Sequence, residues 1–584
     1  MSRESLAVIR VALGLAQGAA LYLLYDAFDA KSWPATEGLL FAPLVLTAVV
    51  LPTLAVAALG NLRLRAFAIW VGVAIVIVAA LGAYDIFHDP VGGGISAAQP
   101  PRNMPSPPLW LAVAAGLFIA HALVVSGDAD RAYIARYPRY FDVAWKHAVQ
   151  AVLAVAFVGT MWAVLALGAA LFELIKIDFL AELLKKRWFS IPVSTLAFTL
   201  AIHLTDVHAG VVRGVRTLKL TLLSWLLPLI TLITVGFLAA LLFTGLDPLW
   251  STRRATSLVL LTAAALILLL NAAYQDGEPE HRVASVLHYV GIAAAVALTP
   301  LVAIAAYGVM LRVGQYGWTP ERIVATSCVV AAACYAIGYG IAVAARPWLR
   351  WIEATNVVAA IVILVVIVAL FSPIADPMRI AVADQVARLE AGRTPVDQFD
   401  FAFLRFRSGR YGMEALGRLK NSEEGREAAR IAEKAVAALD WKRPADATVR
   451  ATPLTPALRA ANITVIFPTG EQLPDSFLQQ DWSSRADSWR LPGCLTGAAT
   501  CEAVLADLDG DGATEILLLE TATATAYQQS RGTWVLLGHV LNVNCRGVRD
   551  ALRSGNFNLV TPGLRDLQAA GQRIWIAREA VCPP

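Results

Sequence analysis

Eleven long apolar segments fill the first two thirds of the sequence and constrain its fold more than any other feature. A helix needs about 20 mostly apolar residues to cross the roughly 30 Å hydrocarbon core of a bilayer. Segments of this kind lie approximately at 5–25, 38–60, 66–84, 109–126, 148–172, 190–207, 220–245, 256–275, 288–311, 322–345 and 352–371. The sequence therefore predicts a polytopic α-helical membrane bundle of about 11 transmembrane helices over residues 1–371.

Charge is distributed unevenly along the 584 residues. Residues 1–371 contain 24 Lys+Arg and 19 Asp+Glu, and the shorter remainder, 372–584, contains 24 and 25. The density of charge thus rises after the last apolar segment, as expected where a chain leaves lipid for water. The net charge of +4 is small and scattered, so the lipid bilayer, and no nucleic acid, is the expected partner.

The orientation follows from Lys and Arg in the short loops, which favour the cytoplasmic side. With the N-terminus in the cytoplasm, cytoplasmic segments carry 14 of these residues and the opposite loops carry 10. The main exception is 176–188, whose alternating apolar and basic residues predict a helix lying in the membrane interface. An odd number of spans then places the C-terminal domain in the periplasm, on the outer side of a bacterial inner membrane.

The cysteines favour the same orientation. Two of the six lie in a predicted span, and the other four lie in the C-terminal part: Cys494, Cys501, Cys545 and Cys582. An even number suits disulfides in an oxidising compartment. The short spacing favours a Cys494–Cys501 bond, which leaves Cys545 with Cys582. Free thiols and a zinc site remain alternatives, although no CxxC spacing is present.

The predicted water-soluble α+β domain has two parts. Residues 374–440 form a helical juxtamembrane segment, with amphipathic stretches at 378–390 and 423–439. Residues 460–584 form a small β-rich domain. Its short apolar or β-branched runs lie at 462–467, 515–520, 533–541 and 573–577. A Pro- and Thr-rich stretch at 443–456 joins the two parts.

Residues 507–515 read Asp-Leu-Asp-Gly-Asp-Gly-Ala-Thr-Glu, the sharpest local motif in the sequence. Carboxylates at alternate positions, with a glycine for the sharp turn, suit an oxygen-only calcium site. An EF-hand would place its bidentate acid at position 12, which is Leu518 here. The motif predicts a structural Ca²⁺ site with these ligands: Asp507, Asp509, Asp511 and Glu515. An acidic hairpin turn that binds no ion is the alternative.

This loop also resembles the calcium loops of integrin-type (FG-GAP) β-propeller blades, which share the pattern DxDGDGxxD before an apolar strand. In those families the acidic side chains and one backbone carbonyl bind the ion. The sequence contains only one copy of the loop. The resemblance therefore implies one calcium loop in a small domain and excludes a complete propeller.

Several polar side chains fall in the apolar segments, where ionisable groups indicate function by default. His203 and Asp206 share one face of a helix, whereas His208 points elsewhere. His121 and Asn271 lie deeper in their spans. A candidate intramembrane polar site therefore contains His121, His203 and Asp206. Polar residues at the end of a span, or interhelical hydrogen bonds, are the alternative interpretations.

No catalytic motif is present. The sequence contains no GxxxxGK[ST], HExxH, GxSxG or Rossmann fingerprint, so it leans against an enzyme and predicts no catalytic residues. Asp85, His88 and Asp89 fall in a predicted external loop rich in Pro and Gly, where we expect solvated side chains.

After the last span the chain reads Phe399-Asp-Phe-Ala-Phe-Leu-Arg405-Phe-Arg-Ser-Gly-Arg-Tyr-Gly412, followed by Glu414-Ala-Leu-Gly. With the many-helix region before it, this segment resembles a family of bacterial inner-membrane proteins known as domain of unknown function 4153. The resemblance implies a membrane location and no established activity, and it transfers no catalytic residue. We expect the phenylalanines to pack and the arginines to reach lipid phosphates or neighbouring helices.

Three functions remain open. The leading hypothesis is a non-enzymatic envelope protein whose periplasmic domain recognises or senses an envelope protein or glycan. The second is a transporter or flippase of a small or lipidic solute, for which an inverted repeat is missing. The third is a membrane-embedded transferase that uses acids of an external loop, such as Asp85 and Asp89.

Overall fold

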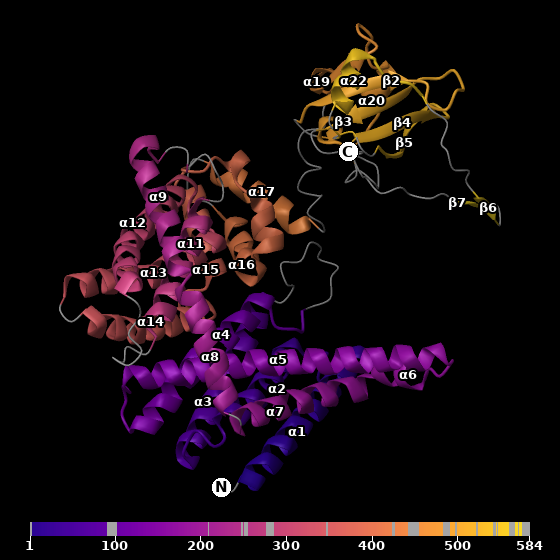
Figure 1. Ribbon diagram of the computed structural model, residues 1–584. Helices are drawn as coiled ribbons and strands as arrows, with labels where there is room; N and C mark the ends of the chain where they lie inside the picture. Colours follow the sequence, from indigo (N-terminus) through magenta and orange to yellow (C-terminus); the bar gives the residue numbers. More distant parts are fainter. Residues whose placement is uncertain are drawn as a thin grey trace. The chain divides into compact units, whose positions relative to one another are not determined.

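Eleven helices long and apolar enough to cross a membrane lie in the described part of the chain, and the last of them ends at Leu370 (Figure 1). This computed structural model describes residues 3–574 except 90–101, 208, 247–248, 250–254, 276–284, 346–347, 423–426, 442–454, 483–490, 497–498, 521–523, 541–542, 544, 546, 560–566 and 570–571. The predicted fold class, a polytopic helical membrane bundle followed by a soluble α+β domain, is confirmed.

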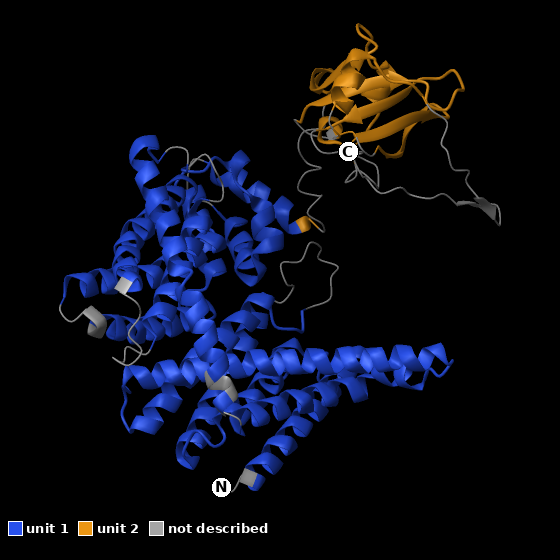
Figure 2. Cartoon of the chain, in the orientation of Figure 1, with its two compact units in different colours: residues 1–439 blue, residues 440–584 orange. Residues whose placement is uncertain are grey.

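Two compact units divide the chain, Met1–Leu439 and Asp440–Pro584 (Figure 2). The membrane helices and the juxtamembrane segment belong to the first unit, and the small sheet belongs to the second. The protein is therefore a multi-pass membrane protein with a separately folded C-terminal unit.

The first half of the bundle contains α1 (Arg3–Asp29), α2 (Gly38–Ala58), α3 (Leu64–His88), α4 (Pro107–Asp130), α5 (Tyr137–Leu174), the short α6 (Phe179–Lys185) and α7 (Arg187–Val207). α1 packs on α7 and α2, while α5 packs on α7 and α4. Local sequence sets the ends of these helices. At the start of α4, for example, the Ser106 hydroxyl caps the Leu109 amide and two prolines follow.

The second half contains α8 (Ala209–Ser224), α9 (Leu227–Thr244), α11 (Ala255–Tyr274), α12 (Ser285–Tyr316), α13 (Pro320–Ala344) and α14 (Trp348–Leu370). α8 and α9 together form one of the eleven candidate spans. The core of this half is apolar and includes Leu227, Leu266, Leu298, Tyr339 and Ile352. Within it, Asn271 donates to the Tyr339 hydroxyl at 2.7 Å, an interhelical hydrogen bond of the kind expected for this residue.

Large apolar side chains point outward along the spans. Leu111, Leu242 and Phe243 are 74%, 84% and 89% exposed in the isolated chain. In water such a continuous apolar surface would associate or aggregate, whereas lipid tails cover it without a hydration cost. The outward face of the bundle is therefore matched to a bilayer.

Close packing of α13 on α14 depends on Gly338. A Cβ at this position would lie 2.1 Å from the Thr355 Oγ1, which is buried and donates to the Trp351 carbonyl at 2.6 Å. We expect Gly338→Ala to reduce the free energy of unfolding by about 1–3 kcal/mol and to lower the Tm in detergent. The control is Gly72→Ala, whose Cβ would meet nothing within 4 Å. Equal losses in both variants would contradict this expectation.

The juxtamembrane segment contains α15 (Pro377–Glu390), the short turns η2 (Val396–Gln398) and η3 (Phe403–Arg407), α16 (Gly409–Leu419) and α17 (Ala428–Asp440). It packs on the membrane helices α13 and α3. The Tyr84 hydroxyl in α3 donates to Asp376 Oδ2 at 2.7 Å and contacts the Tyr411 hydroxyl at 2.8 Å. Phe399, Phe401 and Phe406 are buried, which agrees with their expected packing role.

Within this segment, Asp397 in η2 connects to α17. Its carboxylate pairs with Arg430 at 2.6 Å and with Lys434 at 3.6 Å. The hydrogen bond from Arg430 lowers the pKa of Asp397 below its ordinary value. All three side chains are about half exposed or more, so water and salt screen the pair and its contribution to stability is small.

The expectation that Asp85 is a solvated loop residue is wrong. α3 continues past the predicted end of the span to His88, and Asp85 is only 2% exposed. Its carboxylate pairs with Arg102 and accepts from both the amide and the hydroxyl of Ser106 at 2.7 Å. These partners, distant in sequence, compensate the buried charge and let the helix extend. Arg102 also pairs with Asp89 at 3.5 Å.

The second unit is built on a five-stranded sheet in the order β1-β2-β3-β4-β5. The strands are β1 (Ile463–Phe467), β2 (Cys501–Ala506), β3 (Glu515–Leu519), β4 (Ala524–Ser530) and β5 (Thr533–His539). β1 and β2 are parallel, and the other pairs are antiparallel. Every residue of β3 is buried because apolar clusters cover both faces of the sheet.

Short helices and a second, small ribbon complete this unit: α19 (Pro456–Asn462), α20 (Asp475–Gln479), α21 (Gly493–Thr496), α22 (Val548–Ser554), β6 (Leu567–Ala569) and β7 (Gln572–Ile574). The larger apolar cluster centres on aromatic rings. Phe477 lies 4.9 Å from the ring of Trp482 and 5.2 Å from that of Trp534, between ring centroids. These rings fill the space between the sheet and the helices before it.

Candidate functional site

An arginine is buried near the start of the first membrane helix. Arg10 is 1% exposed, and its Nη2 donates to Asp206 Oδ2 in α7 at 2.9 Å and to the Leu59 carbonyl at 2.8 Å. Its Nη1 lies 3.3 Å from His203 Nδ1. A guanidinium only donates, so this nitrogen of His203 accepts and the proton of the neutral ring is on Nε2.

A second cation contacts the same carboxylate. Lys146 Nζ in α5 lies 2.7 Å from Asp206 Oδ1 and 3.3 Å from Asn61 Oδ1. Asp206 therefore bridges two positive charges, which leaves a net charge of +1 on the three groups. Neutralising partners are needed because an unpaired charge in a low-dielectric interior is costly.

A histidine pair lies next to this ion cluster. His147 follows Lys146 in α5, and its ring centroid is 4.8 Å from that of His121 in α4. Trp70 Nε1 donates to His121 Nδ1 at 3.2 Å, so the proton of a neutral His121 is on Nε2. That Nε2 atom, both ring nitrogens of His147 and the Nε2 of Gln150 are buried without a hydrogen-bond partner among the described residues.

Orphan nitrogens of this kind are uncommon in a protein interior, where buried polar groups are paired. Most of them are donors, as are the nearby Arg10 and Lys146. These donors are therefore suited to bind water molecules or a solute rich in hydrogen-bond acceptors. The arrangement does not suit a metal on His121, since the lone pair of this ring is already used by Trp70.

The structure brings two of the three predicted intramembrane residues together. His203 and Asp206 both contact Arg10, whereas His121 lies in the adjacent histidine pair. His208 lies outside the described residues. Sequence reasoning missed Arg10, Lys146 and His147. Arg10 lies within the predicted span 5–25, a signal that could have identified it, whereas Lys146 lies just before the predicted span 148–172.

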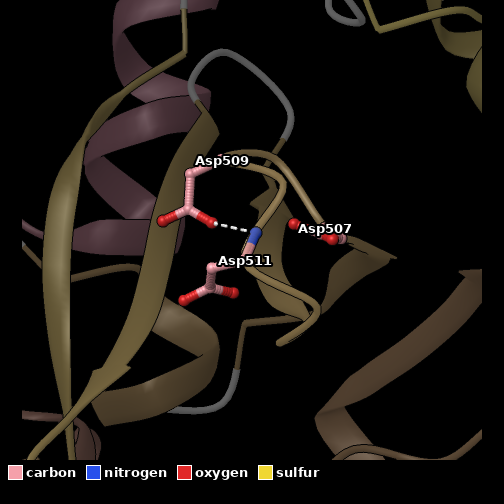
Figure 3. Close-up of side chains that lie close together, drawn as sticks. All are labelled: Asp507, Asp509 and Asp511. Atoms are coloured by element: carbon pink, nitrogen blue, oxygen red, sulfur yellow. Dashed lines mark hydrogen bonds between the residues drawn. The ribbon is translucent and has the colours of Figure 1, made fainter.

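The acidic loop between β2 and β3 gathers three of its four predicted ligands. Asp507, Asp509 and Asp511 each place a carboxylate oxygen within 4.8 Å of the others (Figure 3). Asp507 accepts from the Gly510 and Gly512 amides at 2.7 and 3.0 Å, and Asp509 accepts from the Asp511 amide at 3.2 Å. The two glycines have φ of 80° and 86°, a conformation that side chains disfavour.

The fourth predicted ligand, Glu515, has a different position. It is 1% exposed at the start of β3, and its Oε2 accepts from the Leu508 amide at 2.7 Å. Its Oε1 has no hydrogen-bond partner among the described residues. Glu515 therefore binds the backbone of the loop from the start of β3, while the three aspartates place their own carboxylate oxygens close together. Gln528 of β4 also contacts Asp509, at 2.7 Å.

The Cys494–Cys501 disulfide is present in this unit, as predicted. It links α21 to the first residue of β2, and both cysteines are buried. Cys545 is described, but Cys582 lies outside the described residues, so their pairing stays a prediction.

Comparisons with known proteins identify one relationship. The family model described as "Domain of unknown function (DUF4153)" matches residues 12–419, which include all the spans after the first turns of α1 and the juxtamembrane segment as far as α16. The acidic loop lies outside the match. No curated protein and no solved structure matches the chain. The match covers well over half of the sequence, and the chain therefore belongs to the DUF4153 family.

Proposed function

We propose that the protein is a non-enzymatic inner-membrane protein that presents a calcium-stabilised recognition domain in the periplasm. The observation that carries this proposal is the separately folded C-terminal unit with its acidic loop and its disulfide. Disulfides persist in oxidising compartments, which favours the periplasmic side. An odd number of candidate spans and the excess of Lys and Arg in the predicted cytoplasmic loops support the same orientation.

The orientation is tested with reporter fusions. Alkaline phosphatase fused after the last residue is expected to be active, because it requires an oxidising compartment. The same enzyme fused in the loop before α3, at Arg63, is expected to be inactive, and fluorescent reporters should give the reverse pattern. An active fusion at Arg63 together with an inactive C-terminal fusion would invert the proposed topology.

Calcium is expected to stabilise the C-terminal unit. At a free concentration 100 times the Kd, a ligand that binds only the folded state adds about 2.7 kcal/mol. The measurement is hydrogen exchange of β2 and β3 in the full-length protein, with Ca²⁺ and with Mg²⁺, which needs stricter octahedral geometry. Asp509→Asn combined with Asp511→Asn should abolish the effect. Asp550→Asn, an 82% exposed acid on α22, is the matched control. Equal protection with and without Ca²⁺ would refute the site.

Recognition of an envelope protein or glycan is tested in cells. A photoreactive amino acid at Leu508, an exposed apolar residue within the acidic loop, is expected to form a discrete crosslinked adduct. Asp509→Asn should remove that adduct if the calcium-bound loop presents the surface. A photoreactive residue at Leu559, which is also exposed, controls for non-specific capture. Identical adduct patterns at both positions would argue against recognition by the loop.

A second function, transport or flipping of a solute, is favoured by the buried ion cluster and its orphan donors. Protein reconstituted in liposomes is compared with His147→Gln, which removes unpartnered ring nitrogens and breaks no hydrogen bond among the described residues. Solute or lipid movement that is lost in this variant, and retained in His539→Gln on the exposed face of β5, would support transport. If the native protein moves no solute or lipid, the transport hypothesis is contradicted and the function is assigned to the C-terminal domain.

A further inference from the structure

A pocket lies where the connection between α12 and α13 meets the juxtamembrane segment. Its volume is about 320 Å³, within the range of small-molecule sites. Four charged residues line it, together with the rings of Trp318 and Phe403: Glu321 and Arg322 at the start of α13, and Asp400 and Arg407 after α15. The pocket is therefore both charged and aromatic.

Hydrogen bonds from α15 hold one wall of this pocket. The Gln385 side chain donates to the Tyr316 and Trp318 carbonyls, both at 3.0 Å. Asp384 Oδ2 accepts from the Trp318 amide at 2.7 Å. Gly317 between them has a φ of 75°, and its surroundings leave no space for a Cβ. The connection is thus fixed in one conformation before any ligand arrives, which reduces the entropic cost of binding.

The two guanidinium groups are positioned by aromatic rings and by backbone. Arg322 lies over Tyr316 at 5.5 Å and donates to the Gly317 carbonyl, and Arg407 lies over Phe403 at 5.9 Å. Within the described ranges, neither arginine has a carboxylate at ion-pair distance. Asp400 accepts only from the Phe403 amide at 2.8 Å among the contacts of those residues. Opposite charges thus share one small pocket without forming an ion pair among the described residues.

Unpaired charges of both signs in one pocket are complementary to a zwitterion. Guanidinium groups bind phosphate oxygens through forked, charge-assisted hydrogen bonds. Carboxylates and the faces of Trp and Phe attract an ammonium group. A ligand that carries a phosphate and an amine a few bonds apart would satisfy both sets, whereas a purely anionic ligand would leave Glu321 and Asp400 repelling it.

The position in the chain indicates where that ligand is found. Tyr316 ends one candidate span and Pro320 begins the next, so the pocket lies at the level where helices leave the hydrocarbon. Phospholipid headgroups occupy this level. We propose that the pocket binds a phosphoethanolamine group, the zwitterionic headgroup of a membrane phospholipid.

The test uses full-length, delipidated protein in detergent and native mass spectrometry. Short-chain phosphatidylethanolamine is compared with phosphatidylglycerol, which lacks the amine, and with free phosphoethanolamine. We expect phosphatidylethanolamine to bind at least about tenfold more tightly than phosphatidylglycerol, a difference of about 1.4 kcal/mol. If free phosphoethanolamine binds as tightly as the lipid, the pocket recognises the phosphoethanolamine group itself, and its ligand can also be a soluble molecule. Equal affinity for the two lipids would overturn the proposal.

Two double variants separate the roles of the charges. Arg322→Gln with Arg407→Gln should weaken binding of both lipids by about tenfold or more. Glu321→Gln with Asp400→Asn should remove the preference for the amine while phosphatidylglycerol still binds. If the first double variant does not fold, Arg407→Gln alone replaces it in the binding measurement, because this side chain is exposed. The matched control is Glu390→Gln with Arg393→Gln, exposed charges of the same segment that do not line the pocket. Binding unchanged in the two pocket variants would refute the assignment.

Discussion

Asp206→Asn is expected to reduce the free energy of unfolding by about 3–5 kcal/mol, the cost of removing one partner from a buried ion pair. Among the described residues, the substitution leaves Arg10, 1% exposed, without a carboxylate partner, and it removes the ion pair of Lys146. The Leu59 carbonyl and the His203 ring cannot neutralise a guanidinium. Unfolding in mixed micelles, followed by circular dichroism, measures the loss.

Two further variants test whether burial of the charge is the cause. Asp142→Asn breaks the pair with Arg216, but Asp142 is 52% exposed, so water compensates and the expected loss is about 0–1 kcal/mol. Arg10→Met combined with Asp206→Asn removes the buried cation together with its partner, and it should recover part of the loss. A loss for Asp206→Asn no larger than that for Asp142→Asn would show that the cluster is hydrated rather than buried.

Phe477→Ala is expected to have the largest effect in the C-terminal unit, about 3–5 kcal/mol. The ring is 0% exposed and lies within 5.6 Å of the rings of Trp482, Tyr527 and Trp534, between centroids. Its removal abolishes three ring contacts and leaves a cavity lined by these rings, of which Trp482 and Tyr527 hold each other in an edge-to-face contact. Hydrogen exchange of β4 and β5 at increasing urea concentration measures the loss without interference from the membrane helices.

Leu537→Ala is the matched control on β5. This side chain is 52% exposed, so its truncation removes little buried apolar area and should cost less than about 1 kcal/mol. Membrane helices should show unchanged exchange in both variants if the two compact units unfold independently. Simultaneous loss of protection in the bundle on Phe477→Ala would contradict that independence.

Local patterns predicted the membrane spans and strands β1, β3 and β5, because each could be recognised from a contiguous stretch, whereas β2 (Cys501–Ala506) and β4 (Ala524–Ser530) were not predicted. Twenty apolar residues in a row are sufficient for a span, and alternate acids with glycines are sufficient for the acidic turn. The same logic explains the success of the Cys494–Cys501 bond, whose partners are 7 residues apart. A feature can be predicted from a short stretch of sequence when all the residues that form it lie within that stretch.

Long-range compensation could not be predicted in this way. Asp85 looked like a loop acid because its partners, Arg102 and Ser106, follow a gap in the helical pattern. Arg10 looked like a cytoplasmic charge because the carboxylate that pairs with it, Asp206, lies 196 positions later in the sequence. In both cases the deciding partner is set by tertiary packing.

The separation of Arg10 from Asp206 has a consequence for biosynthesis. The two residues are 196 positions apart, and synthesis at about 5–20 residues per second takes roughly 10–40 s to cover that distance. During this interval the first helix carries an unpaired cation near its start, where the cost is smaller than the about 2.5–3.5 kcal/mol of a charge at the centre of a helix. The charge of Arg10 is therefore neutralised by Asp206 only after α7 has been synthesised.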